Sequence, residues 1–197
     1  MPCIRFIGDV HASFNQYVEM TKEAEISIQV GDFGLGFQTK EDPVPFLTQD
    51  HRFLRGNHDD PAQCEKHPNW IKDGHYDEEL EIFFLGGAKS IDKNQRTPGV
   101  DWWENEELSM PELYAIVDSY SKIKPQIMVT HDCPDIALHD FKIYREKSRT
   151  AQFLNHLCEI HRPHLWVFGH HHKAIEKLIG STLFIGLDTL KFKDINF

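Results

Sequence analysis

Several side chains that can bind a metal ion follow directly after short apolar segments of the chain. Each carries a carboxylate, amide or imidazole group, and the set comprises Asp9, His11, Asp32, Asn57, His131, His170 and His172. Oxygen and imidazole ligands without a thiolate suit divalent ions such as Mn²⁺, Fe²⁺, Zn²⁺ or Ni²⁺. Residues that follow the strands of an open α/β sheet gather at one edge, even when they are distant in sequence. The pattern therefore predicts a divalent metal site at a sheet edge.

Each of these motifs taken alone has an ordinary structural explanation. A Gly-Asp pair after a strand is commonly a turn, and a histidine at a strand end is commonly structural. The combination favours a metal site, because five strand ends carry ligand-type side chains, two of them with DxH and HxH spacing. The alternative is a mononuclear or structural zinc protein in which only the histidine cluster 170–172 binds metal.

Short apolar segments predict the strands that must position these residues. They cover 3–8, 26–30, 52–54, 80–85, 126–130 and 165–168, and a hairpin of 174–179 with 182–187 follows. Helices are predicted over 13–25, 109–121 and 148–160, the second with a capping box of Ser109 and Glu112. Strands and helices alternate before the hairpin, so we expect an α/β fold with mixed sheets and outer helices. The 197 residues suit one domain over 1–197.

Composition narrows the classes of partner. The formal net charge is −10 and no basic run occurs, which disfavours binding to duplex nucleic acid because such binding requires neutralised phosphates. No apolar run approaches the roughly 18 residues of a membrane span, and the N-terminus lacks a signal-peptide pattern, so we expect a cytoplasmic protein with no membrane partner. The four cysteines form no CxxC pair, which is typical of reduced thiols.

The order of the motifs resembles that of the calcineurin-like metallophosphoesterases. Their pattern DxH, GD, GNH[DE], H and GHxH is matched by residues 9–11, 31–32, 56–59, 131 and 169–172. The letters RTPG and WW within 96–103 also resemble small prokaryotic and phage members. The resemblance implies an α/β fold built as a four-layer α-β-β-α sandwich of two mixed sheets, with a two-metal site at one edge.

The resemblance also implies a role for each ligand-type residue. The first ion would be held by Asp9, His11 and His172, the second by Asn57, His131 and His170, and Asp32 would bridge both. His171 would point elsewhere, as a surface or supporting residue. We expect two divalent ions, with Mn²⁺ as the first choice and Fe²⁺, Zn²⁺ or Ni²⁺ as alternatives. Such a pair lowers the pKa of a shared water from about 15.7 towards about 7, so hydroxide is available at neutral pH.

His58 matches the family position that contacts substrate, where an imidazole can protonate the leaving-group oxygen. Asp59 is the predicted partner that orients this imidazole, and its alternative is a turn or helix cap before Pro61. Asn57 would contact substrate as well as metal.

The segment 86–107 is polar and contains two tryptophans, which makes it a candidate substrate-binding region. Arg96 could grip a phosphate and Trp102 could stack on a base; the alternative is a structured loop with its tryptophans packed inward. Arg149 is a weaker candidate, whose alternative is a solvated helix start. Arg55 precedes the GNH motif and is interpreted as structural, because neighbouring strand residues point to opposite faces.

These residues predict a hydrolase that cleaves a phosphomonoester or phosphodiester of a small molecule or nucleotide through a metal-activated hydroxide. A nuclease or polynucleotide phosphatase is an alternative that the charge disfavours. A protein serine/threonine phosphatase is a further alternative, but those of the superfamily carry a second Asp and an Arg after the GD motif. This chain reads GDFGLGF and lacks that phosphate-binding Arg, which disfavours this alternative. A catalytically silent binding scaffold is the alternative of another class, but no ligand is missing here. The sequence leaves the substrate, the native metals and the oligomeric state open.

Overall fold

The strands form two sheets that face each other. The computed structural model describes residues 3–37, 48–143 and 146–197. One sheet has four strands in the order β10 (Phe192–Asn196), β1 (Cys3–Ile7), β2 (Ile26–Gln29) and β3 (His51–Phe53). The other has six in the order β4 (Tyr76–Asp77), β5 (Ile82–Leu85), β6 (Ile127–Thr130), β7 (Leu165–Phe168), β9 (Thr182–Gly186) and β8 (Ile175–Ile179).

Both sheets are mixed, as predicted. The strands β1, β2 and β3 are parallel, and β10 joins β1 in the antiparallel sense. In the larger sheet β5, β6, β7 and β9 are parallel, while β4 and β8 pair antiparallel at its two edges. The carboxyl ends of the parallel strands lie at a common edge in each sheet. The predicted ligand residues follow these strand ends in the sequence and therefore lie at that edge.

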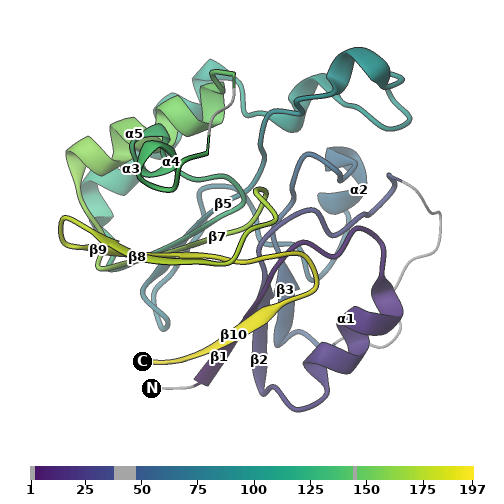
Figure 1. Ribbon diagram of the computed structural model, residues 1–197, viewed down its shortest axis with the longest axis horizontal. Helices are drawn as coiled ribbons and strands as arrows, with labels where there is room; N and C mark the ends of the chain where they lie inside the picture. The colour runs from purple at the N-terminus through teal and green to yellow at the C-terminus, as the bar shows by residue number, and fades with distance from the viewer. Residues whose placement is uncertain (1–2, 38–47, 144–145) are drawn as a thin grey trace.

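Helices cover the outer faces of both sheets (Figure 1). The larger sheet is covered by α3 (Met110–Ile123), α4 (Asp135–Asp140) and α5 (Arg149–Ile160). The smaller sheet packs against α1 (Phe14–Thr21) and α2 (Pro61–Cys64). The predicted capping box is confirmed, because the Ser109 backbone N–H donates to Glu112 Oε2 over 2.8 Å at the start of α3. The layers follow the predicted order of helices, sheet, sheet and helices.

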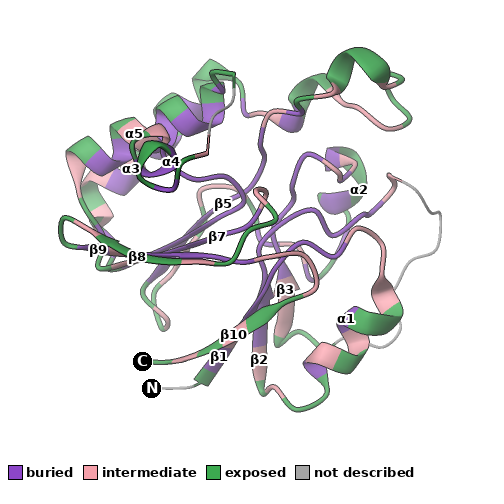
Figure 2. Cartoon of the chain, in the orientation of Figure 1, coloured by how far each residue is buried: buried purple, intermediate pink, exposed green. Residues whose placement is uncertain are grey.

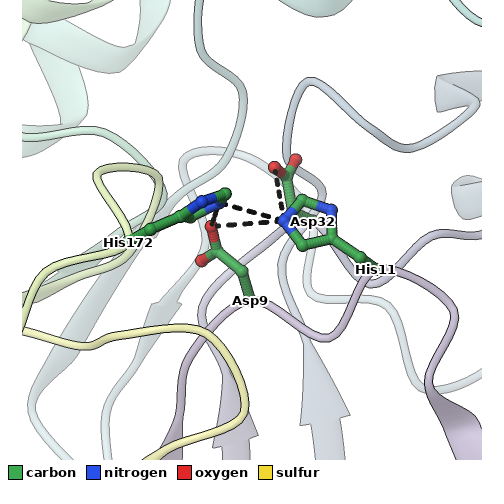
Figure 3. A group of neighbouring side chains, drawn as sticks. All are labelled: Asp9, His11, Asp32 and His172. Atoms are coloured by element: carbon green, nitrogen blue, oxygen red, sulfur yellow. Dashed lines mark hydrogen bonds and ion pairs between the residues drawn. The ribbon is translucent and has the colours of Figure 1, made fainter.

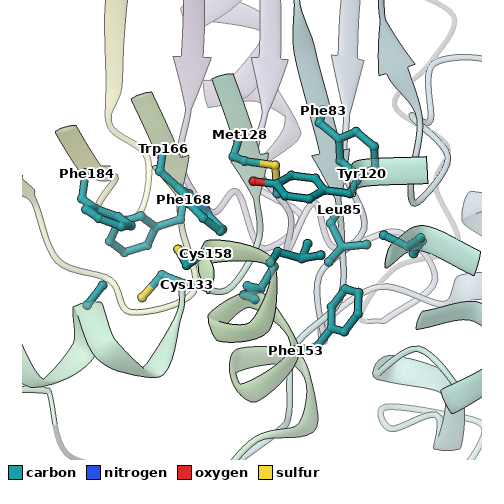
Figure 4. Packing of buried hydrophobic residues seen from close by; sticks show 14 of the residues in the cluster. Phe83, Leu85, Tyr120, Met128, Cys133, Phe153, Cys158, Trp166, Phe168 and Phe184 are labelled. Carbon is teal, nitrogen blue, oxygen red and sulfur yellow. The ribbon is translucent and has the colours of Figure 1, made fainter. Parts of the chain in front are cut away.

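The alternation of side chains along the buried strands builds two cores. On β5, Ile82 and Phe84 face the smaller sheet, whereas Phe83 and Leu85 face the helices. Figure 4 shows the helix-side core, where Phe83 packs edge-on against Tyr120 of α3, with ring centroids 5.4 Å apart. Figure 2 shows the central strands β5 and β7 as buried along most of their length, whereas β8 and β10 are mostly exposed or intermediate. Burial of each such side chain stabilises the fold by roughly 1.5–3 kcal/mol.

Two strands were missing from the prediction. The strand β10 pairs with β1, so its partner lies at the other end of the sequence. Its burial alternates only between exposed and intermediate, which leaves no apolar signal. The strand β4 has two residues and is defined by its pairing with β5. Pairing with distant segments, rather than local sequence, makes both of them strands.

No helix among the described residues combines the length and the apolar character needed to cross a bilayer.

Candidate metal centre

Four side chains from three separate loops point towards one another at the sheet edge (Figure 3). They are Asp9 and His11 after β1, Asp32 after β2 and His172 after β7. The Nε2 atoms of His11 and His172 lie 3.0 Å apart, and His172 Nε2 lies 3.0 Å from Asp9 Oδ2. His11 Nε2 lies 3.9 Å from Asp32 Oδ2. One ligand atom from each of the four residues therefore lies within 4.8 Å of all the others, as binding of a single ion requires.

A second group shares Asp32 with the first. Its other members are His131 after β6 and His170 after β7, again with ligand atoms within 4.8 Å of one another. His131 Nε2 lies 3.2 Å from Asp32 Oδ1 and 3.3 Å from Asn57 Oδ1. The two carboxylate oxygens of Asp32 thus face different groups. The structure brings all seven predicted ligand residues together, with Asp32 between the two sets.

The loops reach this geometry through unusual backbone conformations. Four of the seven residues are in the left-handed region, with φ of 46° at His11, 56° at Asp32, 63° at His170 and 46° at His172. Such conformations cost of the order of 1–3 kcal/mol each outside glycine, and they concentrate at functional sites. Side-chain placement at this edge is therefore maintained at the expense of local backbone stability.

Two motif glycines make room for the carboxylates. A Cβ atom at position 56 would lie 2.1 Å from Asp32 Oδ1, and one at position 169 would lie 2.3 Å from Asp9 Oδ1. Neither contact is compatible with a side chain, so Gly56 and Gly169 allow close approach of the backbone to the ligand carboxylates.

The electrostatics of the second group centre on Asp32 and His131, which are both buried. Burial disfavours the charged form of His131, but the Asp32 carboxylate outweighs it and raises the pKa of the imidazole to about 9. Burial alone would raise the pKa of Asp32, yet His131 and His58 lower it well below its usual range. His131 Nδ1 lies 2.9 Å from the Val30 carbonyl oxygen, which orients the ring so that Nε2 faces Asp32.

The donor set fits a pair of divalent cations. Asp9 Oδ2 is buried, and the imidazole nitrogens of His172 and His11 lie 3.0 and 3.9 Å from it. A buried carboxylate oxygen is costly unless a cation or a hydrogen-bond donor satisfies it. Carboxylate oxygens, imidazole nitrogens and one amide oxygen are ligands for the divalent transition metals, and they do not select one metal among them.

His58 lies beside this centre rather than within it. Its backbone N–H donates to Asp32 Oδ1 over 2.7 Å, and its Nδ1 lies 2.9 Å from Asp32 Oδ2. Its Nε2 contacts the guanidinium group of Arg96. The side chain is thus placed between the shared carboxylate and a cationic side chain that faces the open pocket.

Asp59 does not make the contact with His58 that the sequence predicted. Its carboxylate accepts backbone N–H bonds from Gly56 over 2.7 Å and from residues 33, 34 and 35 over 3.1, 2.7 and 2.9 Å. The alternative role as a helix cap is also wrong, because Asp60 caps α2 by accepting from the Ala62 N–H over 2.9 Å. Asp59 instead ties the GD loop to the GNH loop, a role that short-range sequence reasoning could not anticipate.

A cavity of about 400 Å³ opens over the centre. It is lined by Asp32, Asn57, His58, Ile91, Asp92, Arg96, Ile143, His170, His171 and His172. The segment 86–107 therefore contributes to its wall through Ile91, Asp92 and Arg96.

Of the three substrate contacts predicted outside the motifs, the structure places only Arg96 on this cavity. Its guanidinium is held by Asp92 Oδ1 over 2.7 Å and by Ser90 Oγ over 3.1 Å, and it lies over the Phe37 ring at 5.1 Å. Trp102 is half-buried and is not part of the cavity wall. Arg149 begins α5 and donates to the Glu107 carbonyl over 3.1 Å, also outside the wall.

The middle histidine of the cluster points away from both ligand groups. His171 Nε2 lies 3.2 Å from Asp132 Oδ1 and 3.6 Å from Cys133 Sγ, with which it forms a third group of ligand-type atoms. This contact joins the loop after β6 to the loop after β7.

Sequence reasoning missed two residues, Ser90 and Glu106, that form a chain of hydrogen bonds to Asn57. Ser90 Oγ accepts from Asn57 Nδ2 over 3.1 Å, and Ser90 in turn contacts the carboxylate of Glu106. The polar character of 86–107 marked the segment, but a serine and a glutamate in a loop carry no individual signal. Arg55 is structural, as interpreted, since its guanidinium binds Asp73 and the carbonyls of residues 105 and 106.

Comparison with known proteins identifies the family to which this fold belongs. Residues 4–174 match the family model of the calcineurin-like phosphoesterases, and the chain belongs to this family. Comparison with curated proteins finds no match. Among solved structures, the chain is similar to a Staphylococcus aureus protein assigned provisionally as a 5′-nucleotidase and crystallised with alpha-ketoglutarate, at 12% identity and a TM-score of 0.55. The match covers 95% of this chain and 48% of that one, so it spans about half of that protein and shows a shared fold.

Proposed function

We propose that the protein is a two-metal phosphoesterase that hydrolyses a phosphomonoester or phosphodiester of a small molecule or nucleotide. The observation that carries this proposal is the position of Asp32, whose two oxygens lie 3.2 Å from His131 Nε2 and 3.9 Å from His11 Nε2. In the proposal Asp9, His11 and His172 hold one ion, and Asn57, His131 and His170 hold the other. Two divalent ions, Mn²⁺ as first choice, would supply Lewis acidity and hydroxide at neutral pH.

The chain's own residues would bind and orient the ester. Arg96 is the cationic side chain of the cavity wall next to His58, and a guanidinium matches the geometry of phosphoryl oxygens. A bound phosphate would compete for Arg96 with Asp92 and His58. His58 Nε2 faces a group that can only donate, so Arg96 must shift before this nitrogen can carry a proton to the leaving-group oxygen. Asn57 lines the same wall and would contact the phosphoryl group as well.

The cavity favours a small substrate over a polymer. A volume of about 400 Å³ lies in the range of small-molecule and cofactor sites. Ile91 and Ile143 add apolar surface to the wall beside the charged groups, which suits the organic part of an ester. The net charge of −10 opposes the approach of a polyanion. These features support nucleotides and other small phosphate esters over nucleic acid.

The test is hydrolysis by the Mn²⁺-loaded protein of a panel that pairs monoesters with diesters. The panel would include nitrophenyl phosphate, bis-nitrophenyl phosphate, nucleoside monophosphates, cyclic nucleotides, a phosphopeptide and single-stranded DNA. We expect turnover of at least one small ester, two bound ions per chain by elemental analysis, and no turnover by Asp32→Asn. Binding of one ion only, or full activity of Asp32→Asn, would contradict the proposal.

A further inference from the structure

Asn57 presents two chemically different ends to two different surroundings. Its Oδ1 lies 3.3 Å from His131 Nε2, on the side of the second ligand group, and its Nδ2 donates to Ser90 Oγ over 3.1 Å. The oxygen and nitrogen of an amide are nearly equal in size, so packing does not choose between the two orientations. Hydrogen-bond partners must choose, because only the oxygen can bind a cation.

Glu106 determines whether the Ser90 hydroxyl donates or accepts a hydrogen bond towards Asn57. A carboxylate only accepts hydrogen bonds, so the Ser90 hydroxyl donates to Glu106 Oε2, over 2.5 Å, while the Ser90 N–H donates to Oε1 over 3.0 Å. With its proton committed, Ser90 Oγ can only accept. It accepts from Asn57 Nδ2 and from Arg96, whose Nη1 lies 3.1 Å away. The nitrogen end of the amide must therefore face Ser90.

All three members of this chain of hydrogen bonds are buried. Exposed fractions are 3% for Asn57, 1% for Ser90 and 4% for Glu106. Arg55 holds the backbone of Glu106 in place, because Arg55 Nη1 donates to the Glu106 carbonyl over 3.0 Å. A glutamate that only improved solubility would not be buried, and burial strengthens its control over Ser90 because water does not compete for the hydroxyl.

We propose that Glu106 is a positioning residue that acts through Ser90 to hold the amide oxygen of Asn57 towards the second metal ion. The inference rests on the proposed function for the identity of that ion. It assigns to the segment 86–107 a part in building the metal centre, besides its place in the cavity wall. The same Ser90 oxygen binds Arg96, so metal ligand and phosphate-binding side chain share one anchor.

The substitution Glu106→Gln tests the chain of hydrogen bonds with little change in shape. The side-chain amide that it introduces can donate to Ser90 Oγ, which frees the hydroxyl proton to point at Asn57. A donating Ser90 hydroxyl favours the amide orientation in which the Asn57 oxygen faces Ser90 and the nitrogen faces the ion. Loss of such a supporting hydrogen bond weakens metal binding by about 10- to 100-fold. Glu104→Gln is the matched control, since Glu104 lies in the same short helical turn, η3 (Glu104–Glu106), and is exposed.

The measurement is a Mn²⁺ titration of metal-free protein, followed by calorimetry or by electron paramagnetic resonance, without substrate. We expect Glu106→Gln to weaken the second ion about 10- to 100-fold, to leave the first ion unchanged and to keep the melting temperature of the metal-free protein. Wild-type affinity for both ions in folded Glu106→Gln would overturn the inference. Ser90→Ala breaks the same chain independently, and wild-type affinity in that variant would also overturn it.

A double-mutant comparison separates orientation from general structural support. Asn57→Asp places an oxygen at both ends of the side chain, so no orientation is needed, but the end that faces Ser90 then needs a donor. In that background Glu106→Gln supplies one, because it frees the Ser90 proton. We expect Glu106→Gln to strengthen the second ion's binding in Asn57→Asp protein, the opposite of its effect in the wild type. Equal weakening in both backgrounds would overturn the positioning role.

The two proposals can fail separately. Ion binding is measured without an ester, so a wild-type protein that binds two ions and hydrolyses nothing in the panel would contradict the proposed function alone. A fully active enzyme whose second ion is indifferent to both Glu106→Gln and Ser90→Ala would overturn the positioning role alone.

Discussion

The loops at the strand ends and the segment 86–107 both reach the centre, but they do so in different ways. The strand-end loops present ligand-type side chains whose chemistry is evident from residue type, such as Asp32 and His131. The segment 86–107 contributes Ser90, Arg96 and Glu106, which act through hydrogen bonds to other residues. The difference shows that candidate metal ligands are recognisable by residue type and spacing, whereas supporting contacts depend on which surfaces the fold brings together.

The largest effect is expected at the residue that both ligand groups share. Asp32→Asn removes the negative charge between the two proposed ion positions and one of the oxygens that would face them. We expect loss of at least one ion and a fall in activity beyond the roughly 100-fold that a lost supporting contact causes. Elemental analysis and steady-state kinetics check this. A variant that retains both ions and near-normal turnover would contradict the role of Asp32 as the residue shared by the two ligand groups.

Asp59→Ala tests the strand-end loops for stability rather than chemistry. The substitution leaves four backbone N–H groups without their acceptor, at a cost of about 1–3 kcal/mol for each group that stays buried and unpaired. We expect the free energy of unfolding, measured in urea, to fall by about 4 kcal/mol or more. Asp60→Ala, which removes the cap of α2 and an exposed contact with Gln63 Nε2, is the control and should cost about 1 kcal/mol. Equal costs for the two variants would refute the structural role assigned to Asp59.

His58→Ala separates proton transfer from metal binding. The side chain lies beside the shared carboxylate but is not one of the seven proposed ligand residues. We expect kcat to fall by about 10²- to 10⁴-fold with both ions retained, because general acid catalysis contributes an effect of that size. Kinetics and metal content are measured on the same preparation. Loss of an ion in this variant would place His58 among the ligands instead.

Arg96→Ala compared with Arg149→Ala asks whether the cavity wall identifies the phosphate-binding residue. Charge-assisted hydrogen bonds contribute about 1.5–3 kcal/mol, so we expect kcat/KM to fall by about 10- to 100-fold for Arg96→Ala. Arg149→Ala should stay within about twofold of the wild type, because Arg149 binds a loop carbonyl away from the cavity. Similar losses of kcat/KM in both variants would show that a position on the cavity wall does not distinguish Arg96 from Arg149.

The smallest effect is expected at Trp102. The residue belongs to 86–107, but the structure does not place it on the cavity wall. We expect Trp102→Phe to change KM by less than about twofold for any substrate of the panel. A large rise in KM confined to substrates with a base would restore the stacking role predicted from the sequence.

The prediction of the fold succeeded where the signal is local. Apolar runs that end at a glycine identified β1, β2, β5 and β7, the run before His131 identified β6, and the residue types Ser109 and Glu112 identified the start of α3. The prediction failed for β10, which is a strand because β1 offers it an open edge. It also failed for the partner of Asp59, because that carboxylate accepts four backbone N–H bonds from two loops instead of a bond from the His58 imidazole.

The sequence by itself determined the family, the sheet-and-helix class and the set of ligand-type residues, because coordination chemistry restricts which side chains can stand at those positions. Only the tertiary structure decided that Asp59 ties two loops together, that Arg96 and not Arg149 or Trp102 reaches the cavity, and that Glu106 stands behind Asn57. The physical reason is that hydrogen bonds between groups distant in sequence have no sequence signature. Their partners are chosen by distance and direction, which exist only once the chain has folded.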